Sequence, residues 1–267
     1  MSGNQTDVDS NRVIQGLWIG GELSAMEQLS IASFIENGHE YHLYTYEAVK
    51  NIPRKTIVRD AEEILPRSSA FQYSGIPSWS GFSNFFRYKL LLERGGWWFD
   101  TDFVCLRPLT FPEEHVFASE LTLGRKMVTS GAIKAPPGSE AMQLAWDTCQ
   151  SKDPQKIVWG ETGPALVGGI VEKFGMQTSV MEPNTFCPIP YREWRRVLNP
   201  DFDESECDRS FALHFWHEMW RSSGQDKNRH YHPASLYERL RRRFLGDQER
   251  ISTDSLHSII GTLAGET

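Results

Sequence analysis

The sequence predicts an α/β fold, with a mostly parallel central sheet and helices on both of its faces. One observation is a strand–helix–strand pattern over residues 12–46, because a helix that connects two adjacent strands makes them parallel. Another is a helix followed at once by an aromatic strand over residues 80–99. Ligands of such sheets bind beyond the carboxyl ends of the strands. The residues that follow each strand are therefore the first candidates for a functional site.

The opening unit has a local signal for each element. The stretch RVIQGLWIG, residues 12–20, reads as a strand that ends at a Gly-Gly pair, where backbone can approach a ligand closely. A capping-box pattern over residues 24–27 begins a helix, and Asn-Gly at 37–38 ends it. A second strand follows over residues 41–46. Trp18 would then lie in the ligand crevice.

Two aspartates follow the strand of the second unit. A helical pattern begins near Ser80, the pair Gly95-Gly96 can end it, and Trp-Trp-Phe at 97–99 reads as a buried strand. Asp100 and Asp102 come directly after that strand. Residues two apart in an extended segment point the same way, so both carboxylates can converge on one ligand.

The remaining elements continue the alternation, and without repeats or linkers they predict a single domain. Its expected bounds are residues 12–250, between a disordered N-terminus at 1–11 and a C-terminal tail at 251–267. Residues 57–66 read as a connection and residues 217–228 as a polar loop. The other expected elements are strands over 116–120, 127–134 and 210–216, helices over 138–149 and 236–245, and a turn at 159–164 that enters a helix ending at 174.

Composition excludes some functions and favours a compartment. With 39% hydrophobic residues the 267-residue chain can form a large core, and its net charge of −7 argues against nucleic-acid partners. The four cysteines form no C-x-x-C pair, so a zinc knuckle or disulfide framework is not indicated and a reducing cytoplasm fits best. No apolar run reaches membrane-spanning length. These features predict a cytoplasmic protein. They are also compatible with a peripheral contact at the inner face of a membrane.

The paired aspartates suggest a divalent cation. Carboxylates beside an aromatic strand are costly to desolvate unless a metal or ligand compensates them. The alternative is that they cap a turn or pair with Arg87 and Arg107. An all-oxygen site suits Mg²⁺ or Mn²⁺, and an imidazole ligand would favour Mn²⁺. His214 and His217 are both candidates for that imidazole.

Four motifs in order resemble one enzyme family. The run FFRYKLLLERGGWWFDTD, residues 85–102, is similar to the core of the DXD-motif sugar transferases. That family includes capsular polysaccharide, α-1,4-galactosyl- and mannosyltransferases, with the large clostridial glucosylating toxins as distant relatives. The opening LWIGG, the turn at 162–164 and the late ALHFWHEMW, residues 212–220, also resemble family segments. The resemblance covers most of residues 12–230.

The resemblance implies a GT-A fold and a metal-dependent glycosyltransferase that builds polysaccharide or a related glycan. Such an enzyme moves a sugar from a nucleotide-sugar, here most simply a UDP-sugar, to a glycan, a lipid-linked saccharide or another acceptor, with retention of anomeric configuration. Breaking the bond to phosphate leaves extra negative charge, which Mn²⁺ or Mg²⁺ and protein cations stabilise. By this resemblance the donor and metal residues are Trp18, Ile19, Arg87, Asp100, Asp102 and His214.

Five further residues are candidates on weaker grounds. Glu161, in the turn at 159–164, could orient the acceptor, or could simply be a first-turn carboxylate favoured by the helix dipole. Asn84 stands where relatives often have Asp, and Ser130 where they often have Asn. Trp220 could close over the donor, and Lys227 could hold its diphosphate.

Two other functions fit parts of the pattern. Phosphatases of the haloacid dehalogenase class also place D-x-D after an apolar strand, and Asp100 would then be the nucleophile. A carbohydrate-binding protein could keep the fold without turnover. Nucleotide-sugar binding separates the transferase from the phosphatase, and catalysis separates it from the binding protein.

Overall fold

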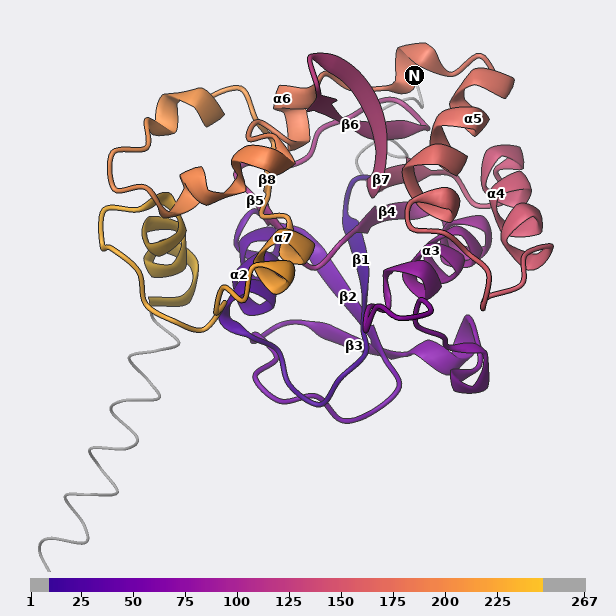
Figure 1. The fold of residues 1–267 in the computed structure, drawn as a ribbon, viewed down its shortest axis with the longest axis horizontal. Coiled ribbons are helices and arrows are strands. Elements are labelled where there is room, and N and C mark those ends of the chain that lie inside the picture. The colour runs from indigo at the N-terminus through magenta and orange to yellow at the C-terminus, as the bar shows by residue number, and fades with distance from the viewer. Residues whose placement is uncertain (1–9, 247–267) are drawn as a thin grey trace, which may run out of the picture.

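The computed structural model describes residues 10–246, and a six-stranded sheet forms their centre (Figure 1). The strand order is β3-β2-β1-β4-β7-β6. Strand β7 is antiparallel to both neighbours, so the other five strands run in one direction and the mostly parallel prediction is confirmed. The strands are β1 (Val13–Trp18), β2 (Glu40–Thr45), β3 (Ile57–Asp60), β4 (Gly96–Phe99), β6 (Val116–Thr122) and β7 (Arg125–Ala135).

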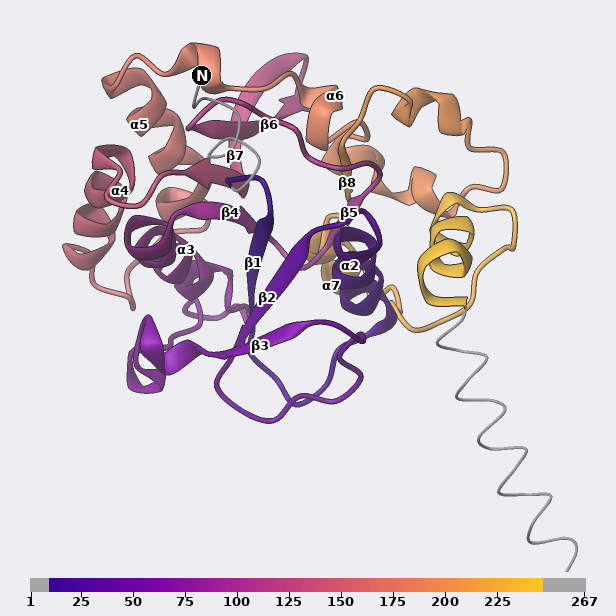
Figure 2. The same cartoon turned by 180° about the vertical axis from the view of Figure 1, so that it is seen from behind.

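Helices cover both faces of this sheet. Figures 1 and 2, seen from opposite sides, place α3 (Ser80–Arg94), α4 (Glu140–Gln150) and α5 (Leu166–Lys173) on one side and α2 (Ala25–Glu36) on the other. The adjacent tryptophans of β4 divide between the two faces. Trp98 packs beside Phe86 of α3, whereas Trp97 shares a core cluster with Phe34 of α2. Both tryptophans are core residues, as expected of a strand buried on both faces.

The opening unit forms as the local signals predict, with one strand added. The capping box is present, and β1 pairs in parallel with β2. Residues 57–66 were expected to be a connection, but Ile57–Asp60 is the edge strand β3, parallel to β2. This strand has only four residues and is largely exposed, so it lacks the apolar run by which a strand is recognised.

Two glycines make the sharp turn from α3 into β4. Gly95 and Gly96 have φ angles of 63° and 87°, values that favour glycine. A Cβ atom on Gly95 would lie 2.5 Å from the Pro137 ring. The turn brings Asp100 beside β7, where its backbone N–H donates to the carbonyl of Gly131 over 2.8 Å. The glycine pair therefore sets where the aspartates emerge.

A second, two-stranded sheet positions the late histidine. Strand β5 (Phe103–Cys105) pairs antiparallel with β8 (Ala212–His214), and Phe103 lies opposite His214. The predicted strand over 210–216 is thus shorter and belongs to a separate sheet. Residues 217–228 were expected to be a polar loop, but His217–Ser222 forms the short helix α7. The other helices here are α6 (Pro183–Phe186), 3₁₀ segments at 191–198 and 204–207, and a last helix that begins at 236 as expected.

The chain ends lie partly outside the described residues. The expected disorder at the N-terminus concerns residues 1–11, but Asn11 belongs to the fold: its side chain donates to the carbonyl of Phe111 and accepts from the Trp97 indole. The expected tail at 251–267 lies outside the described range, and the bounds of a single domain at 12–250 stay a prediction. Within residues 10–246 no helix is both long and apolar enough to cross a membrane.

Candidate active site

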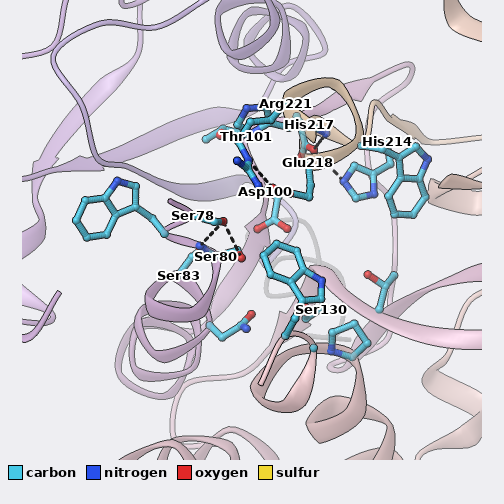
Figure 3. Close-up of a pocket in the computed structure, with 18 of the residues that line it drawn as sticks. Ser78, Ser80, Ser83, Asp100, Thr101, Ser130, His214, His217, Glu218 and Arg221 are labelled. Carbon is cyan, nitrogen blue, oxygen red and sulfur yellow. Dashed lines mark hydrogen bonds and ion pairs between the residues drawn. The ribbon is translucent and has the colours of Figure 1, made fainter. Parts of the chain in front are cut away.

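A cavity of about 640 Å³ opens beyond the carboxyl ends of β1 and β4. Figure 3 shows Asp100 in its middle, between the serines at the start of α3 and the residues of β8 and α7. The sheet topology predicted this position, because both strands point their carboxyl ends there. Of the residues singled out from the sequence, the cavity is lined by Trp18, Ile19, Asn84, Arg87, Asp100, Asp102, Ser130, His214 and His217.

Asp100 is held by the α3 side of the cavity. Its Oδ1 lies 2.9 Å from the Arg87 guanidinium and accepts a hydrogen bond from the Trp98 indole over 3.0 Å. Its side chain keeps 31% of its surface exposed toward the cavity. One carboxylate oxygen is thus fixed by the protein, while the residue still faces a ligand.

Arg87 is more deeply embedded than its sequence pattern indicated. Helical spacing puts Arg87 nearly opposite the apolar stripe of α3, a pattern that predicts a polar face, yet its side chain is only 2% exposed. The guanidinium donates to the carbonyl of Ser130, contacts Ser83 and lies 4.9 Å from the centre of the Trp98 ring. With its charge opposite Asp100, Arg87 fixes that carboxylate from within the wall. A direct contact of Arg87 with a donor stays a prediction.

Asp102 is held by a different set of donors. Its Oδ2 lies 3.1 Å from His214 Nε2 and accepts the backbone N–H of His217 over 2.7 Å. His214 is sandwiched between the Phe103 and Trp216 rings, whose centres are 4.0 and 3.8 Å from its own. Of the two histidines left open by the sequence, His214 is the one whose imidazole faces the aspartate.

The two carboxyl groups therefore have opposite pKa shifts. Burial raises the pKa of Asp100, and the opposing effect of Arg87 does not cancel it. Burial acts on Asp102 as well, but the charge and hydrogen bond of His214 and the N–H of His217 outweigh it and lower the pKa. Asp102 is the more firmly ionised of the pair.

The donor set fits a divalent ion that a substrate helps to bind. Ligands at about 2.1 Å from an octahedral ion, at right angles to each other, are about 3.0 Å apart, close to the spacing of Asp102 Oδ2 and His214 Nε2. No three His, Cys, Asp or Glu side chains of the described chain are arranged to hold an ion by themselves. Mg²⁺ and Mn²⁺ sites of this kind are completed by substrate phosphates and water. Asp102 and His214 fit such a site, and Asp100 fits as a further ligand through its second oxygen.

Trp18 and Ile19 form the cavity wall at the end of β1. The Trp18 indole nitrogen is buried without a hydrogen-bond partner, so a ligand that enters can satisfy it. Lys227 does not line the cavity, but its Nζ lies 5.6 Å from the centre of the Trp18 ring and is paired with the buried carboxylate of Glu27. A diphosphate contact of Lys227 requires this ion pair to open.

Asn84 and Ser130 meet at the floor of the cavity beside Gly163. A Cβ atom on Gly163 would lie 3.2 Å from Ser130 Oγ and 3.3 Å from Asn84 Nδ2. Asn84 donates to the Thr162 hydroxyl over 3.3 Å. The turn at 162–164 is therefore part of this wall, as its place in the motif set suggested.

Besides Lys227, two of the predicted site residues lie outside the cavity. Trp220 is fully buried and packs against Trp194 and Tyr237 in the core, so it cannot contact a ligand here. Trp220 is close to His214 in the sequence, but its large apolar side chain is buried in the core instead of facing the cavity. Glu161 points away from the cavity: it accepts the backbone N–H of Val158 and pairs with Lys152. It is neither an acceptor contact nor a bare first-turn carboxylate.

Several cavity residues were missed by sequence reasoning, and Glu120, Thr122 and Trp216 are three of them. Burial raises the pKa of the Glu120 carboxyl, and the neighbouring Thr122 hydroxyl opposes that shift. Both side chains line the cavity. Trp216 is of a residue type that mostly packs in cores, but it lines the cavity over His214. Alternation along β6 places Glu120 and Thr122 on one face, a signal that was available in the sequence.

Two family models match the chain on both sides of this cavity. Residues 25–121 match the glycosyltransferase sugar-binding region containing the DXD motif, and residues 152–244 match the α-1,4-glycosyltransferase conserved region. The first includes Asp100 and Asp102, and the second includes His214. The chain belongs to the DXD-motif glycosyltransferases. Its sheet has five strands in the same direction and one antiparallel strand, and it is of the expected GT-A type.

Relatives of this DXD-motif glycosyltransferase include two curated enzymes. Human α-1,4-N-acetylglucosaminyltransferase is 27% identical over 148 residues, which are 50% of this chain and 41% of the relative. The gorilla lactosylceramide 4-α-galactosyltransferase is 25% identical over 151 residues, 52% of this chain and 44% of the relative. The chain thus matches less than half the length of each.

Solved structures with a related shape are also glycosyltransferases. The PaToxG glycosyltransferase has a TM-score of 0.45 and 15% identity, covering 66% of this chain and 78% of its own. The apo form of the glycosyltransferase GlyE from Streptococcus pneumoniae TIGR4 has a TM-score of 0.44 and 12% identity. The match covers 89% of this chain and 63% of GlyE.

Proposed function

We propose that this chain transfers a hexose from a UDP-sugar to a saccharide acceptor in a metal-dependent reaction. The observation that supports this most is the pair of carboxylates in one cavity, one fixed by Arg87 and the other facing His214. Both lie at the carboxyl end of β4, where an α/β sheet binds its ligands. The family assignment gives the same reaction class.

The donor binds across the cavity in this proposal. Trp18 stacks on the base, and Asp100 accepts hydrogen bonds from the ribose and the sugar through the oxygen that Arg87 leaves available. Asn84 and Ser130 offer an amide and a hydroxyl to the sugar. The relatives' names specify α-linked N-acetylglucosamine and α-linked galactose, which supports a UDP-sugar donor and an α-linked product.

Departure of the diphosphate is the step that needs charge stabilisation. A bound Mn²⁺ or Mg²⁺ supplies a positive charge for the leaving oxygens, held by Asp102 and His214. The backbone N–H of His217 keeps Asp102 oriented and ionised. If Lys227 exchanges Glu27 for the diphosphate, it adds a second cation. We assign no protein nucleophile, and without one retention requires the acceptor hydroxyl to attack on the face that the diphosphate leaves.

One rival function is disfavoured, and the other is separated only by an activity measurement. A haloacid dehalogenase phosphatase needs Asp100 as nucleophile, whereas Arg87 and Trp98 hold one of its oxygens and the family models match glycosyltransferases. A binding protein without turnover has the same cavity, so catalysis alone separates it. A cytoplasmic location rests on the cysteines, all four free and buried, and stays a prediction.

A thermal-shift screen with UDP-, GDP- and CMP-sugars, each with and without Mn²⁺, tests the donor. We expect a rise in Tm with one UDP-sugar that is larger with Mn²⁺, because a ligand that binds only the native state stabilises it. Slow hydrolysis of that UDP-sugar should follow. The proposal fails if no nucleotide-sugar raises Tm, and binding without either hydrolysis or transfer would favour the non-catalytic protein.

A further inference from the structure

An exposed tryptophan stands at the edge of the cavity. Trp159 lines the cavity with 46% of its surface exposed, although large aromatic side chains are costly to leave in water. Its ring centre lies 5.0 Å from that of Tyr73, a buried residue that lines the same cavity. The two rings are tilted by 41°, and nearly half of the Trp159 surface stays exposed beside Tyr73.

The turn that carries Trp159 is braced from two sides. On the outside, Glu161 accepts the backbone N–H of Val158 over 3.0 Å and pairs with Lys152 at 2.8 Å. On the inside, the Tyr88 hydroxyl donates to the carbonyl of Thr162 over 2.8 Å. These bonds hold the backbone before and after Trp159. The indole is therefore presented on a fixed support rather than on a loose loop.

The aromatic pair is separate from the Trp18 ring assigned to the base. Trp18 packs against the core cluster on the α2 side of the sheet, whereas Tyr73 belongs to the cluster on the α3 side, against which Ile19 also packs. Asp100 lies between the start of α3 and α7 in Figure 3 and faces the same space. A donor with its base on Trp18 thus leaves the aromatic pair to a second molecule.

A hexopyranose suits this surface. One face of a β-galactoside or β-glucoside presents adjacent C–H groups, which pack on an aromatic ring, while its hydroxyls stay available to water and polar groups. An anionic or purely polar ligand would gain little from an exposed indole, whose ring face carries partial negative charge. The apolar wall therefore selects a sugar ring over an anionic acceptor group.

We propose that Trp159 and Tyr73 form the acceptor subsite, on which the terminal hexopyranose of a saccharide acceptor stacks. Glu161 is a positioning residue that holds the turn. The inference rests on the proposed function, since it identifies the class of acceptor for the same cavity. It also gives Glu161 a part in acceptor binding without a contact to the sugar.

Ligand-observed NMR with methyl β-galactoside and methyl β-glucoside tests the subsite without turnover. Saturation transferred to the ring C–H protons should be clear with wild-type protein in the presence of UDP and Mn²⁺. Trp159→Ala should remove it, and Trp159→Phe should restore most of it. Val158→Ala is the matched control: it changes an apolar side chain of the same turn that is 68% exposed and does not line the cavity.

Kinetics then separate stacking from donor binding. In transfer assays with the same two glycosides, Trp159→Ala should raise the acceptor KM at least about fivefold and leave the donor KM unchanged. Glu161→Ala should raise the acceptor KM by a smaller factor, and Glu161→Gln, which can still accept the Val158 N–H, should lie between Glu161→Ala and wild type.

Different failures identify different errors. If wild-type protein shows no shift in Tm with any nucleotide-sugar, the proposed function is wrong. If it binds UDP-sugar and both glycosides but Trp159→Ala binds the glycosides equally well, the acceptor subsite is wrong. Donor binding without any saturation transfer from either glycoside would also overturn the subsite.

Discussion

The two sides of the cavity hold their carboxylates in opposite ways. On the α3 side, Asp100 faces the guanidinium of Arg87, which is buried and always charged. On the α7 side, Asp102 faces His214 and the backbone N–H of His217. The first side is a helix–turn–strand unit within the main sheet, and the second is built from a two-stranded sheet and a short helix. Two aspartates separated by a single residue thus have different surroundings.

The difference suggests a division of work between the aspartates. Arg87 compensates Asp100 before any ligand arrives, so Asp100 can orient neutral hydroxyl groups without needing a metal. Asp102 has a lowered pKa and an imidazole beside it, so it stays ionised and can bind a cation together with His214. The D-x-D spacing alone does not distinguish these roles. The partners of each carboxylate do.

The largest expected effect comes from the α7 side. Asp102→Asn should lower transfer and UDP-sugar hydrolysis at least about 10³-fold, because it removes a charge that holds the metal. An amide can still accept the His217 N–H, so Tm should change little. Asp201→Asn, an exposed residue away from the cavity, is the control and should leave activity unchanged. Equal activity in the two variants would remove Asp102 from the metal site.

A stability change should mark the α3 side instead. Arg87→Met leaves Asp100 without its cation and the Ser130 carbonyl without its donor, and should lower the free energy of unfolding by about 3 kcal/mol. Adding Asp100→Asn should recover part of this loss, since the unpaired charge is then gone. Denaturant unfolding measures both.

Lys89→Met on the same helix serves as the matched control for Arg87. Lys89 pairs with Glu93 near the surface, so its loss should cost less than about 0.5 kcal/mol. If Arg87→Met is no more costly than Lys89→Met, the buried pair does not hold the α3 side together. The contrast between the two sides would then lose its physical basis.

The parts predicted well from the sequence carry local signals. The Ser24 capping box and the Gly95-Gly96 pair fix ends of helices by the chemistry of one or two residues, and both appear as expected. The carboxyl end of β4 followed from them, and with it the place of the aspartates. His214 could be named as a candidate because few residue types complete an oxygen-rich metal site.

The parts predicted poorly depend on contacts far along the chain. Helical spacing puts Arg87 and Asn84 on one polar face of α3. Strand β7 covers that face at Arg87, whose guanidinium donates to the Ser130 carbonyl. Trp220 is core because Trp194 and Tyr237 pack on it from other segments. Helix α7 follows Trp216, whose φ of 59° is uncommon for residues other than glycine. No local sequence pattern predicts such a turn. Tertiary packing overrides the pattern in each case.

The smallest expected effect is on the pH dependence of stability and concerns His39. Unlike His214, this buried histidine is not hydrogen-bonded to a carboxylate. His39 accepts the backbone N–H of Leu109 at Nε2, and its Nδ1 lies 2.9 Å from the carbonyl of Asn11, an arrangement that needs the neutral ring. Burial lowers the pKa of His39 in the folded protein. The unfolded chain therefore binds a proton first as the pH falls, and stability is lost from about pH 6.5 downward. His39→Gln, which keeps a polar side chain without titrating, should lose less Tm than wild type between about pH 7.5 and pH 5.5. If Tm falls equally in both proteins, His39 binds protons equally in the folded and unfolded chain. The acid sensitivity then arises at other groups.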